Sequence, residues 1–266
     1  MIVDSHCHVW PDAVAPRALA GSIEGAERFG DGRVASLIET MDAAGVDRAV
    51  CLGIANQPER LESANRFVGS LDRERFIGFG TIHPGAPVEA NVEGLRRNGL
   101  RGAKVHPYFQ GYSLDDPGLW RIFEAMEGEF AVIMHVGVAG EDPGERCTPA
   151  MAASIADAFP GLAVIACHFG GYWKLDDAEE VLIGKANVFL DTSWPPRVEE
   201  VGLERIRSLI ERHGEDRVLF ASDWPMADPA AERATIERLG LGEAATAKVL
   251  GGNFLRLLEE RTAAPR

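Results

Sequence analysis

Cysteine is scarce in this sequence of 266 residues, and no two cysteines form a C-x-x-C pair. The four scattered positions are Cys7, Cys51, Cys147 and Cys167. This spacing excludes the paired-cysteine pattern of a structural zinc knuckle and is not that of a disulfide framework. We therefore expect reduced thiols and a cytoplasmic protein.

Long apolar runs and an excess of positive charge are also missing. No run approaches the roughly 20 residues of a membrane span, and no basic segment precedes an apolar core, so we expect no signal peptide. Lys and Arg total 27 against 41 Asp and Glu, a net charge of -14. This balance disfavours nucleic acid and anionic membranes as partners. A small-molecule substrate is the expected partner, and a homodimer is a candidate assembly.

The sequence does contain a regular alternation of short apolar runs and charge-rich helical runs. Strands are expected at residues 1–8, 46–53, 75–82, 99–106, 130–137, 162–168, 187–193 and 217–223. Helices are expected at residues 33–44, 58–72, 88–98, 117–127, 149–159, 176–186, 198–213 and 229–239, with one or two more between 242 and 260. Eight strand–helix units match a (β/α)8 TIM barrel, an α/β fold of typically about 250 residues. We expect a single domain over residues 1–266.

An open, doubly wound sheet is the competing architecture. It requires a glycine-rich phosphate turn after an early strand, whereas the first strand here ends in Asp4-Ser5-His6-Cys7-His8. The barrel is therefore the favoured fold.

Histidines gather where the expected strands end. Six of the seven, all except His213, follow this rule: His6, His8, His83, His106, His135 and His168. The carboxyl ends of barrel strands form the face that carries active sites. The pair at the first strand points to one side, because strand side chains alternate with period two. This positional bias indicates a metal or acid/base site.

Each candidate residue, taken by itself, also has an explanation that involves no metal. The pair His6 and His8 can arise by chance, and His135 can bond to a backbone carbonyl. Asp223, which ends the eighth expected strand, can cap the next helix. Together, three imidazoles and a carboxylate suit zinc or another divalent transition metal, manganese included. Such an ion lowers the pKa of its bound water and polarises a carbonyl group.

The ordered set of strand-end motifs resembles the amidohydrolase superfamily. It resembles in particular the amidohydrolase-related branch that also contains aminocarboxymuconate-semialdehyde decarboxylase-like enzymes. The motifs are Asp4-Ser5-His6-Cys7-His8, Arg75 to Gly80, Gly102 to Pro107, His135, His168-Phe169-Gly170-Gly171, Phe220 to Pro225 and Lys248 to Phe254. The resemblance covers nearly the whole chain and implies the same barrel fold.

The resemblance also implies a role for each matching residue. His6, His8, His135 and Asp223 would bind one divalent metal ion, with zinc expected and manganese as the alternative. His168 would polarise the metal-bound water or hold the substrate, and Asp223 would take and pass on the water's proton.

The fourth expected strand leaves two roles open. Some superfamily members carry a carbamylated lysine there that bridges two metals, and Lys104 occupies this strand. The favoured alternative is an ordinary lysine that orients a substrate carboxylate or pairs with an acid. His83 and His106 are each followed by proline and are not assigned as ligands.

Aromatic residues follow several of the expected strands and predict a pocket for a small planar or cyclic substrate. Packing between loops is the alternative role for most of them. The residues that we expect to contact substrate are Trp10, Lys104, Tyr108, Trp194, Arg197 and Trp224.

Three functions follow from these features. The leading prediction is a metal-dependent hydrolase in which activated water attacks a small ester, lactone or amide. The alternative is a metal-dependent decarboxylase acting on a small aromatic or unsaturated carboxylic acid, because decarboxylases of the branch use nearly the same ligands. The third is a non-catalytic binding protein on a barrel scaffold.

Overall fold

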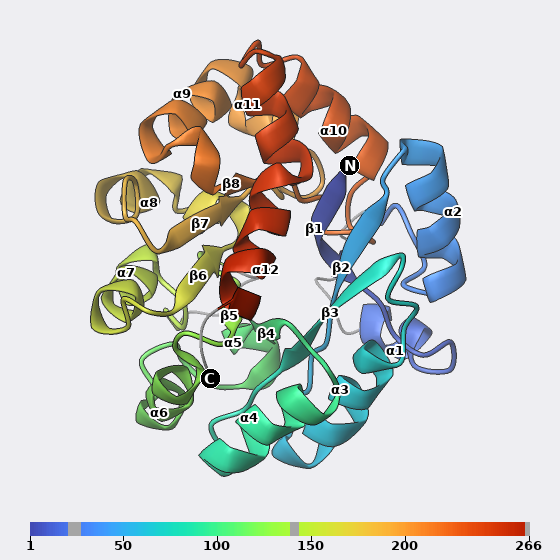
Figure 1. Cartoon of the computed structure of the whole chain (residues 1–266), viewed down its shortest axis with the longest axis vertical. Coiled ribbons are helices and arrows are strands. Elements are labelled where there is room, and N and C mark those ends of the chain that lie inside the picture. Colours follow the sequence, from blue (N-terminus) through green and yellow to red (C-terminus); the bar gives the residue numbers. More distant parts are fainter. Residues whose placement is uncertain (21–27, 139–143, 264–266) are drawn as a thin grey trace. The chain divides into compact units, whose positions relative to one another are not determined.

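The computed structural model describes residues 1–20, 28–138 and 144–263. Its strands follow one another in a single eight-stranded sheet, in the order β1 to β8. They are β1 (Val3–His8), β2 (Arg48–Leu52), β3 (Phe76–Thr81), β4 (Gly102–Val105), β5 (Ala131–Met134), β6 (Ala163–Ala166), β7 (Val188–Asp191) and β8 (Val218–Leu219). This is the predicted (β/α)8 TIM-barrel fold, and each strand lies within its predicted range (Figure 1).

Helices separate the strands as the sequence predicts. The expected ones are α2 (Val34–Ala44), α3 (Leu61–Gly69), α4 (Val88–Arg97), α6 (Pro117–Met126), α7 (Pro149–Ala158), α8 (Leu175–Val181), α9 (Leu203–His213) and α10 (Pro229–Glu237). The closing segment holds α11 (Glu243–Ala247) and α12 (Asn253–Ala263). Two short helices, α1 (Ala15–Ala20) and α5 (Pro107–Gln110), are missing from the prediction because neither is long enough to show a helical period.

The chain forms two compact units. Unit 1 comprises Met1–Cys51, Asp72–Ile77 and Asp191–Arg256, and unit 2 comprises Leu52–Leu71, Gly78–Leu190 and Leu257–Arg266. The predicted extent of one domain, residues 1–266, stays a prediction. No helix within the described ranges combines the length and apolar character needed to cross a bilayer.

In unit 1 the first strand pairs with the segment that continues β8. The Ser5 N–H donates to the Phe220 carbonyl at 2.9 Å, and Cys7 forms a parallel bridge with Trp224. This pairing brings the end of β1 beside the loop between β8 and α10. The polar residues at these two ends are therefore neighbours, although more than 200 positions separate them in the sequence.

In unit 2 the central strands are apolar on both faces. Parallel pairs join β4 to β5 and β5 to β6, with Ile133 opposite Lys104 on one side and Ile165 on the other. Every residue of these three strands is buried, as expected for a parallel sheet covered by helices. Lys104 is the one charged side chain among these strand residues, and its place inside the unit bears on its role below.

Helix α10 carries a buried acid. Glu232 is 2% exposed, and its carboxyl oxygens accept the Val198 N–H at 3.0 and 3.3 Å. Burial raises the pKa of Glu232 to about 8, and the nearby charges of Asp4, Asp228 and Glu199 act in the same direction. The carboxyl group is therefore mostly protonated in the folded protein at neutral pH.

This raised pKa predicts a pH-dependent stability. The folded state holds the Glu232 proton more tightly than the unfolded chain does. The stabilisation is therefore complete below pH 4.5, the ordinary pKa of a glutamate, and is lost as pH rises through the folded pKa of about 8. We expect the free energy of unfolding to fall by a few kcal/mol between pH 5 and pH 9, as measured by urea unfolding. The variant Glu232→Gln, which keeps an acceptor for Val198, should flatten that decline. Parallel pH curves for the two proteins would contradict the assignment.

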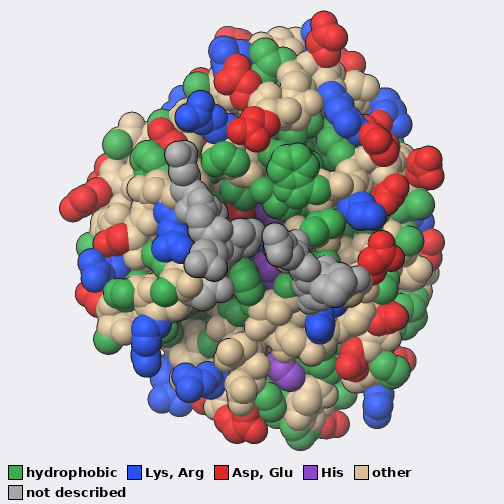
Figure 2. Space-filling view, turned by 180° about the vertical axis from the view of Figure 1, so that it is seen from behind, with side chains coloured by type: hydrophobic (Ala, Val, Ile, Leu, Met, Phe, Trp, Pro, Cys, Tyr) green, Lys and Arg blue, Asp and Glu red, His purple; other side chains and the backbone are tan. Residues whose placement is uncertain are grey.

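Acidic and basic side chains are interspersed on the surface. Figure 2 shows red and blue side chains alternating around the face that it presents. Many form ion pairs, for example Arg96 with Glu93 and Glu129. Exposed pairs of this kind contribute little to stability.

Candidate functional site

The end of β1 and the loop after β8 bring three predicted residues together in unit 1. His6 Nε2 lies 3.1 Å from His8 Nε2, and Asp223 Oδ1 lies 3.3 Å from His6 Nε2 and 3.4 Å from His8 Nε2. All three residues are less than 10% exposed. The structure thus confirms that the residues are neighbours, while their role as metal ligands stays a prediction.

The spacing of these three atoms fits a shared divalent ion. Imidazole nitrogen and carboxylate oxygen bind such ions at about 2.0–2.2 Å, which places two adjacent ligand atoms about 3 to 3.5 Å from each other. The distances between His6, His8 and Asp223 lie in that interval. Two imidazoles and one carboxylate suit zinc, manganese or a related transition metal. The group therefore fits the metal that the sequence predicts.

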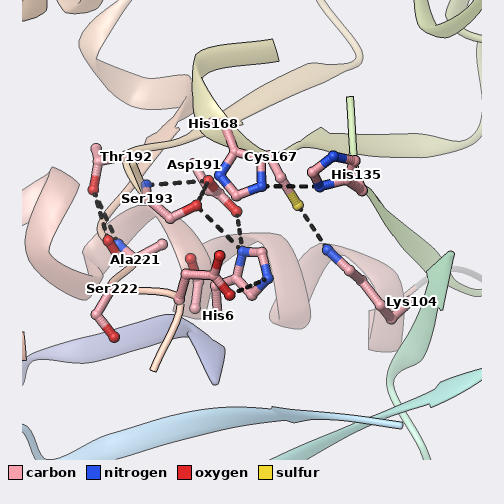
Figure 3. Close-up of polar contacts among 12 residues, drawn as sticks. His6, Lys104, His135, Cys167, His168, Asp191, Thr192, Ser193, Ala221 and Ser222 are labelled. Carbon is pink, nitrogen blue, oxygen red and sulfur yellow. Dashed lines mark hydrogen bonds and ion pairs between the residues drawn. The ribbon is translucent and has the colours of Figure 1, made fainter. Parts of the chain in front are cut away.

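Two residues that the sequence prediction missed fix the orientation of His6. His6 Nδ1 donates to Asp191 Oδ2 at 2.9 Å, and Ser193 Oγ donates to Asp191 Oδ1 at 2.6 Å (Figure 3). Because Nδ1 carries the proton in this bond, the lone pair of Nε2 is left for a ligand on the side of His8 and Asp223. The available signal was the polar run Asp191-Thr192-Ser193 at the end of the seventh expected strand.

A second network of hydrogen bonds, centred on Asp4, joins β1 to the segment after β8. Asp4 Oδ1 accepts the N–H groups of His6 and Ser222, and Asp4 Oδ2 accepts the Ser222 hydroxyl at 2.5 Å. The next residue, Asp223, has a φ of 64°, a left-handed conformation that costs energy in a non-glycine residue. Burial raises the pKa of Asp4 to about 6, although its hydrogen bonds to Ser222 oppose the change. Asp4 therefore holds Ser222, the residue before the strained Asp223, against β1.

The bond between Asp191 and His6 predicts a loss of metal affinity on substitution. In Asp191→Asn the amide cannot stabilise the His6 tautomer as a carboxylate does, so affinity for Zn²⁺ should fall about 10- to 100-fold. Competition with a chelating dye would measure this. Asp12→Asn, at an exposed position in unit 1, is the control and should bind like the wild type. Equal Zn²⁺ affinities for the wild type and both variants would show that Asp191 does not contribute to metal binding.

Three imidazoles gather in unit 2. His168 Nε2 and His135 Nδ1 lie 3.1 Å apart. The His106 ring stacks on His135, with centroids 4.1 Å apart and an angle of 12°, and it also stacks on Phe109 with centroids 4.0 Å apart. All three histidines are buried. The structure thus pairs the predicted His135 and His168, and it shows that the unassigned His106 packs against the His135 ring.

Lys104 is buried beside a thiol. Its side chain is 0% exposed, and Nζ donates to Cys167 Sγ at 3.0 Å (Figure 3). The role of Lys104 toward a substrate or a second metal stays a prediction. The other unassigned histidine, His83, accepts the Gly85 N–H on Nδ1 in a loop.

The residues predicted to contact substrate fall into two groups. Trp10 stacks on His8 at 5.9 Å, and Tyr108 lies edge-on to His135 at 6.2 Å, so both adjoin a candidate imidazole. Trp194 and Trp224 are 5% and 0% exposed and are packed inside the protein. A Cβ atom on Gly30 would lie 2.5 Å from the Trp224 ring, which indicates that this indole supports a loop. Arg197 is exposed in unit 1.

Comparison with known proteins finds a family model and a curated relative that match most of the chain. The model of the amidohydrolase family matches residues 3–259. The 2-amino-3-carboxymuconate-6-semialdehyde decarboxylase of Dictyostelium discoideum is 26% identical over 230 residues, which are 72% of this chain and 63% of the relative. The chain therefore spans less than two thirds of that relative's length.

Solved structures share the fold. The 5-carboxyvanillate decarboxylase of Sphingomonas paucimobilis aligns with a TM-score of 0.73 and 20% identity, over 97% of this chain and 98% of its own. A dihydroxybenzoic acid decarboxylase of Polaromonas, solved with bound manganese and the inhibitor 2-nitroresorcinol, aligns with a TM-score of 0.72 and 16% identity, over 97% and 96% of the two chains.

These comparisons overturn the leading functional prediction. The sequence favoured hydrolysis of an ester, lactone or amide, whereas the curated relative and the structural neighbours named above are decarboxylases. The prediction was wrong because the ligand set expected for hydrolysis is nearly the same as that for carbon–carbon cleavage. The residues that would hold the metal therefore carry no information about which bond is broken.

Proposed function

The chain belongs to the amidohydrolase family, and on this premise we propose that it is a metal-dependent decarboxylase acting on a small aromatic or unsaturated carboxylic acid. The proposed metal dependence rests on the convergence of His6, His8 and Asp223, with Asp191 orienting His6. The proposed reaction rests on the decarboxylases to which the chain is similar. The name of the curated relative supports decarboxylation.

The proposed metal ligands are His6, His8, His135 and Asp223. His6, His8 and Asp223 adjoin one another in unit 1. His135 is included because of its position in the sequence pattern. A divalent ion held there would supply positive charge that polarises a substrate oxygen. Zinc remains the proposed ion, and manganese is supported by the ion bound in one structural neighbour.

Decarboxylation requires one proton for each carbon dioxide released. The bond to the carboxylate breaks, its electron pair stays on the substrate carbon, and a proton must replace the lost group. We assign the holding and delivery of that proton to the Asp223 carboxyl group and the His168 imidazole, the two catalytic residues of the proposal. His168 is positioned by its contact with His135 Nδ1, and its ring meets the Tyr172 ring at 5.1 Å.

Among the predicted substrate contacts, Trp10 and Tyr108 are retained for a planar substrate because each adjoins a candidate imidazole. Lys104 remains the proposed partner of a carboxylate. Because Trp194 and Trp224 are buried, we propose that they pack beneath the residues that line the pocket. The four cysteines are buried and form no disulfide with one another, which supports a reducing, cytoplasmic location. A small-molecule substrate and a homodimer complete the proposal.

The proposal is tested by measuring carbon dioxide. Purified protein, stripped of metal and reloaded with Zn²⁺ or Mn²⁺, is assayed on hydroxybenzoates and unsaturated dicarboxylic acids, with esters and lactones as a second panel. We expect metal-dependent release of carbon dioxide from at least one acid. Metal-independent turnover, or turnover confined to the esters and lactones, would overturn it.

A further inference from the structure

A groove with arginines along it lies in unit 1. It has a volume of about 480 Å³ and runs between the segment after β7, the loop between β8 and α10, and α10 itself. The residues that define this arginine groove are Arg28, Phe29, Arg197, Met226, Glu232 and Arg238. The described residues that line it include none of His6, His8 and Asp223.

Two guanidinium groups in the groove have no partner within the described part of the chain. Arg238 pairs with Glu199 at 3.3 Å. Arg28 and Arg197, in contrast, make no side-chain hydrogen bond or ion pair with any described residue, and both line the groove. The guanidinium group has a fork of N–H donors that matches a carboxylate. The groove therefore presents unused donors for an anion.

The acidic residues of the groove do not cancel this charge. Glu232 lies at the base, and burial raises its pKa to about 8, so it is mostly neutral at pH 7. The Asp228 carboxylate, which caps α10 by accepting the Ala230 N–H at 2.9 Å, offsets the charge of one of the three arginines Arg28, Arg197 and Arg238. Glu199 is committed to Arg238. The charge that remains along the groove is positive, in a chain whose net charge is -14.

The remaining lining is apolar and held in place. Phe29 exposes 52% of its surface, an unusual position for an aromatic ring. The N–H groups of Phe29 and Gly30 both donate to the Pro225 carbonyl, at 2.9 and 3.0 Å, which fastens this segment to the loop after β8. Met226, within that loop, adds a flexible apolar side chain to the groove. The groove thus offers an apolar wall beside two cationic donors.

We propose that the arginine groove is a second binding site, apart from the candidate metal centre, for a small organic acid with an aromatic or aliphatic body. Arg28 and Arg197 take the carboxylate, and Phe29 and Met226 contact the apolar body. An inorganic anion would use only the first of these two features. The proposal does not depend on which reaction the metal centre catalyses.

Calorimetric titration with benzoate, using metal-free full-length protein, tests the site. The variant Arg28→Gln/Arg197→Gln should raise the benzoate Kd at least tenfold. The control variant Arg17→Gln/Arg60→Gln, with two other exposed arginines, should bind as the wild type does. Asp223→Asn should leave this binding unchanged, because Asp223 does not line the groove.

A further variant and a second anion separate binding of the organic acid from simple binding of an anion. Phe29→Ser should weaken benzoate binding while leaving the weak binding of inorganic phosphate unaltered. Benzoate binding that survives the double arginine substitution, that vanishes in Asp223→Asn, or that phosphate matches in affinity would overturn the proposal. Circular dichroism and the melting temperature confirm that each variant is folded.

Discussion

Replacing Asp223 with Asn is expected to lower kcat/KM for decarboxylation by at least about 1,000-fold, since one substitution removes an anionic ligand and a proton carrier. Asp223 Oδ1 lies within 3.4 Å of the Nε2 atoms of both His6 and His8. An amide at this place offers a weaker ligand oxygen and no titratable proton. The zinc content of the purified variant, measured by elemental analysis, should fall well below one ion per chain.

Two comparisons separate this effect from simple unfolding. Asp223→Asn removes no apolar group, so its melting temperature should stay near that of the metal-free wild type. Asp12→Asn, an exposed change in the same unit, should retain full activity and metal. If Asp223→Asn keeps both its zinc content and its turnover, Asp223 is not a metal ligand, and the reaction proposed for this site is wrong.

The second large effect is expected at Gly137, where two backbone segments of unit 2 approach closely. Gly137 has a φ of 111° and forms a parallel bridge with Tyr172. A Cβ atom at position 137 would lie 2.3 Å from both the backbone N and the backbone O of Tyr172. Because backbone atoms cannot yield as a flexible side chain can, Gly137→Ala should cost about 3 kcal/mol or more.

The chain supplies a matched control for this substitution. Gly184 also has a positive φ, 83°, but a Cβ there would meet nothing within 4 Å. Gly184→Ala should therefore cost only about 1 kcal/mol, the price of the left-handed backbone. Urea unfolding of the three proteins measures the difference. Equal losses would show that backbone conformation, and not the contact with Tyr172, determines the effect.

Gly137→Ala should also disturb the imidazoles of unit 2. The Tyr172 N–H donates to the Val136 carbonyl at 2.9 Å, and the Tyr172 ring packs on His168 at 5.1 Å. Pushing the Tyr172 backbone away withdraws this ring from His168. At a temperature where the variant is still folded, we expect kcat to fall more than stability alone explains.

Strand and helix positions could be predicted from the sequence because their signals are local. Buried parallel strands read as short apolar runs, such as Ala131–Met134, and amphipathic helices show a 3.6-residue period. The pairs Asp116-Pro117 and Asp228-Pro229 mark helix starts, and both aspartates accept backbone N–H groups as caps. Helix α5, with four residues, has too few positions to display any period.

The sequence by itself determined the barrel and the group His6, His8 and Asp223, since polar residues at the ends of parallel strands meet on one face. Only the tertiary structure decided which atoms touch. It disclosed that Asp191 and Ser193 hold His6, that Asp4 holds the segment carrying Asp223, and that Lys104 donates to Cys167. Pairings of this kind join residues up to 218 positions apart and depend on side-chain directions that no local pattern encodes.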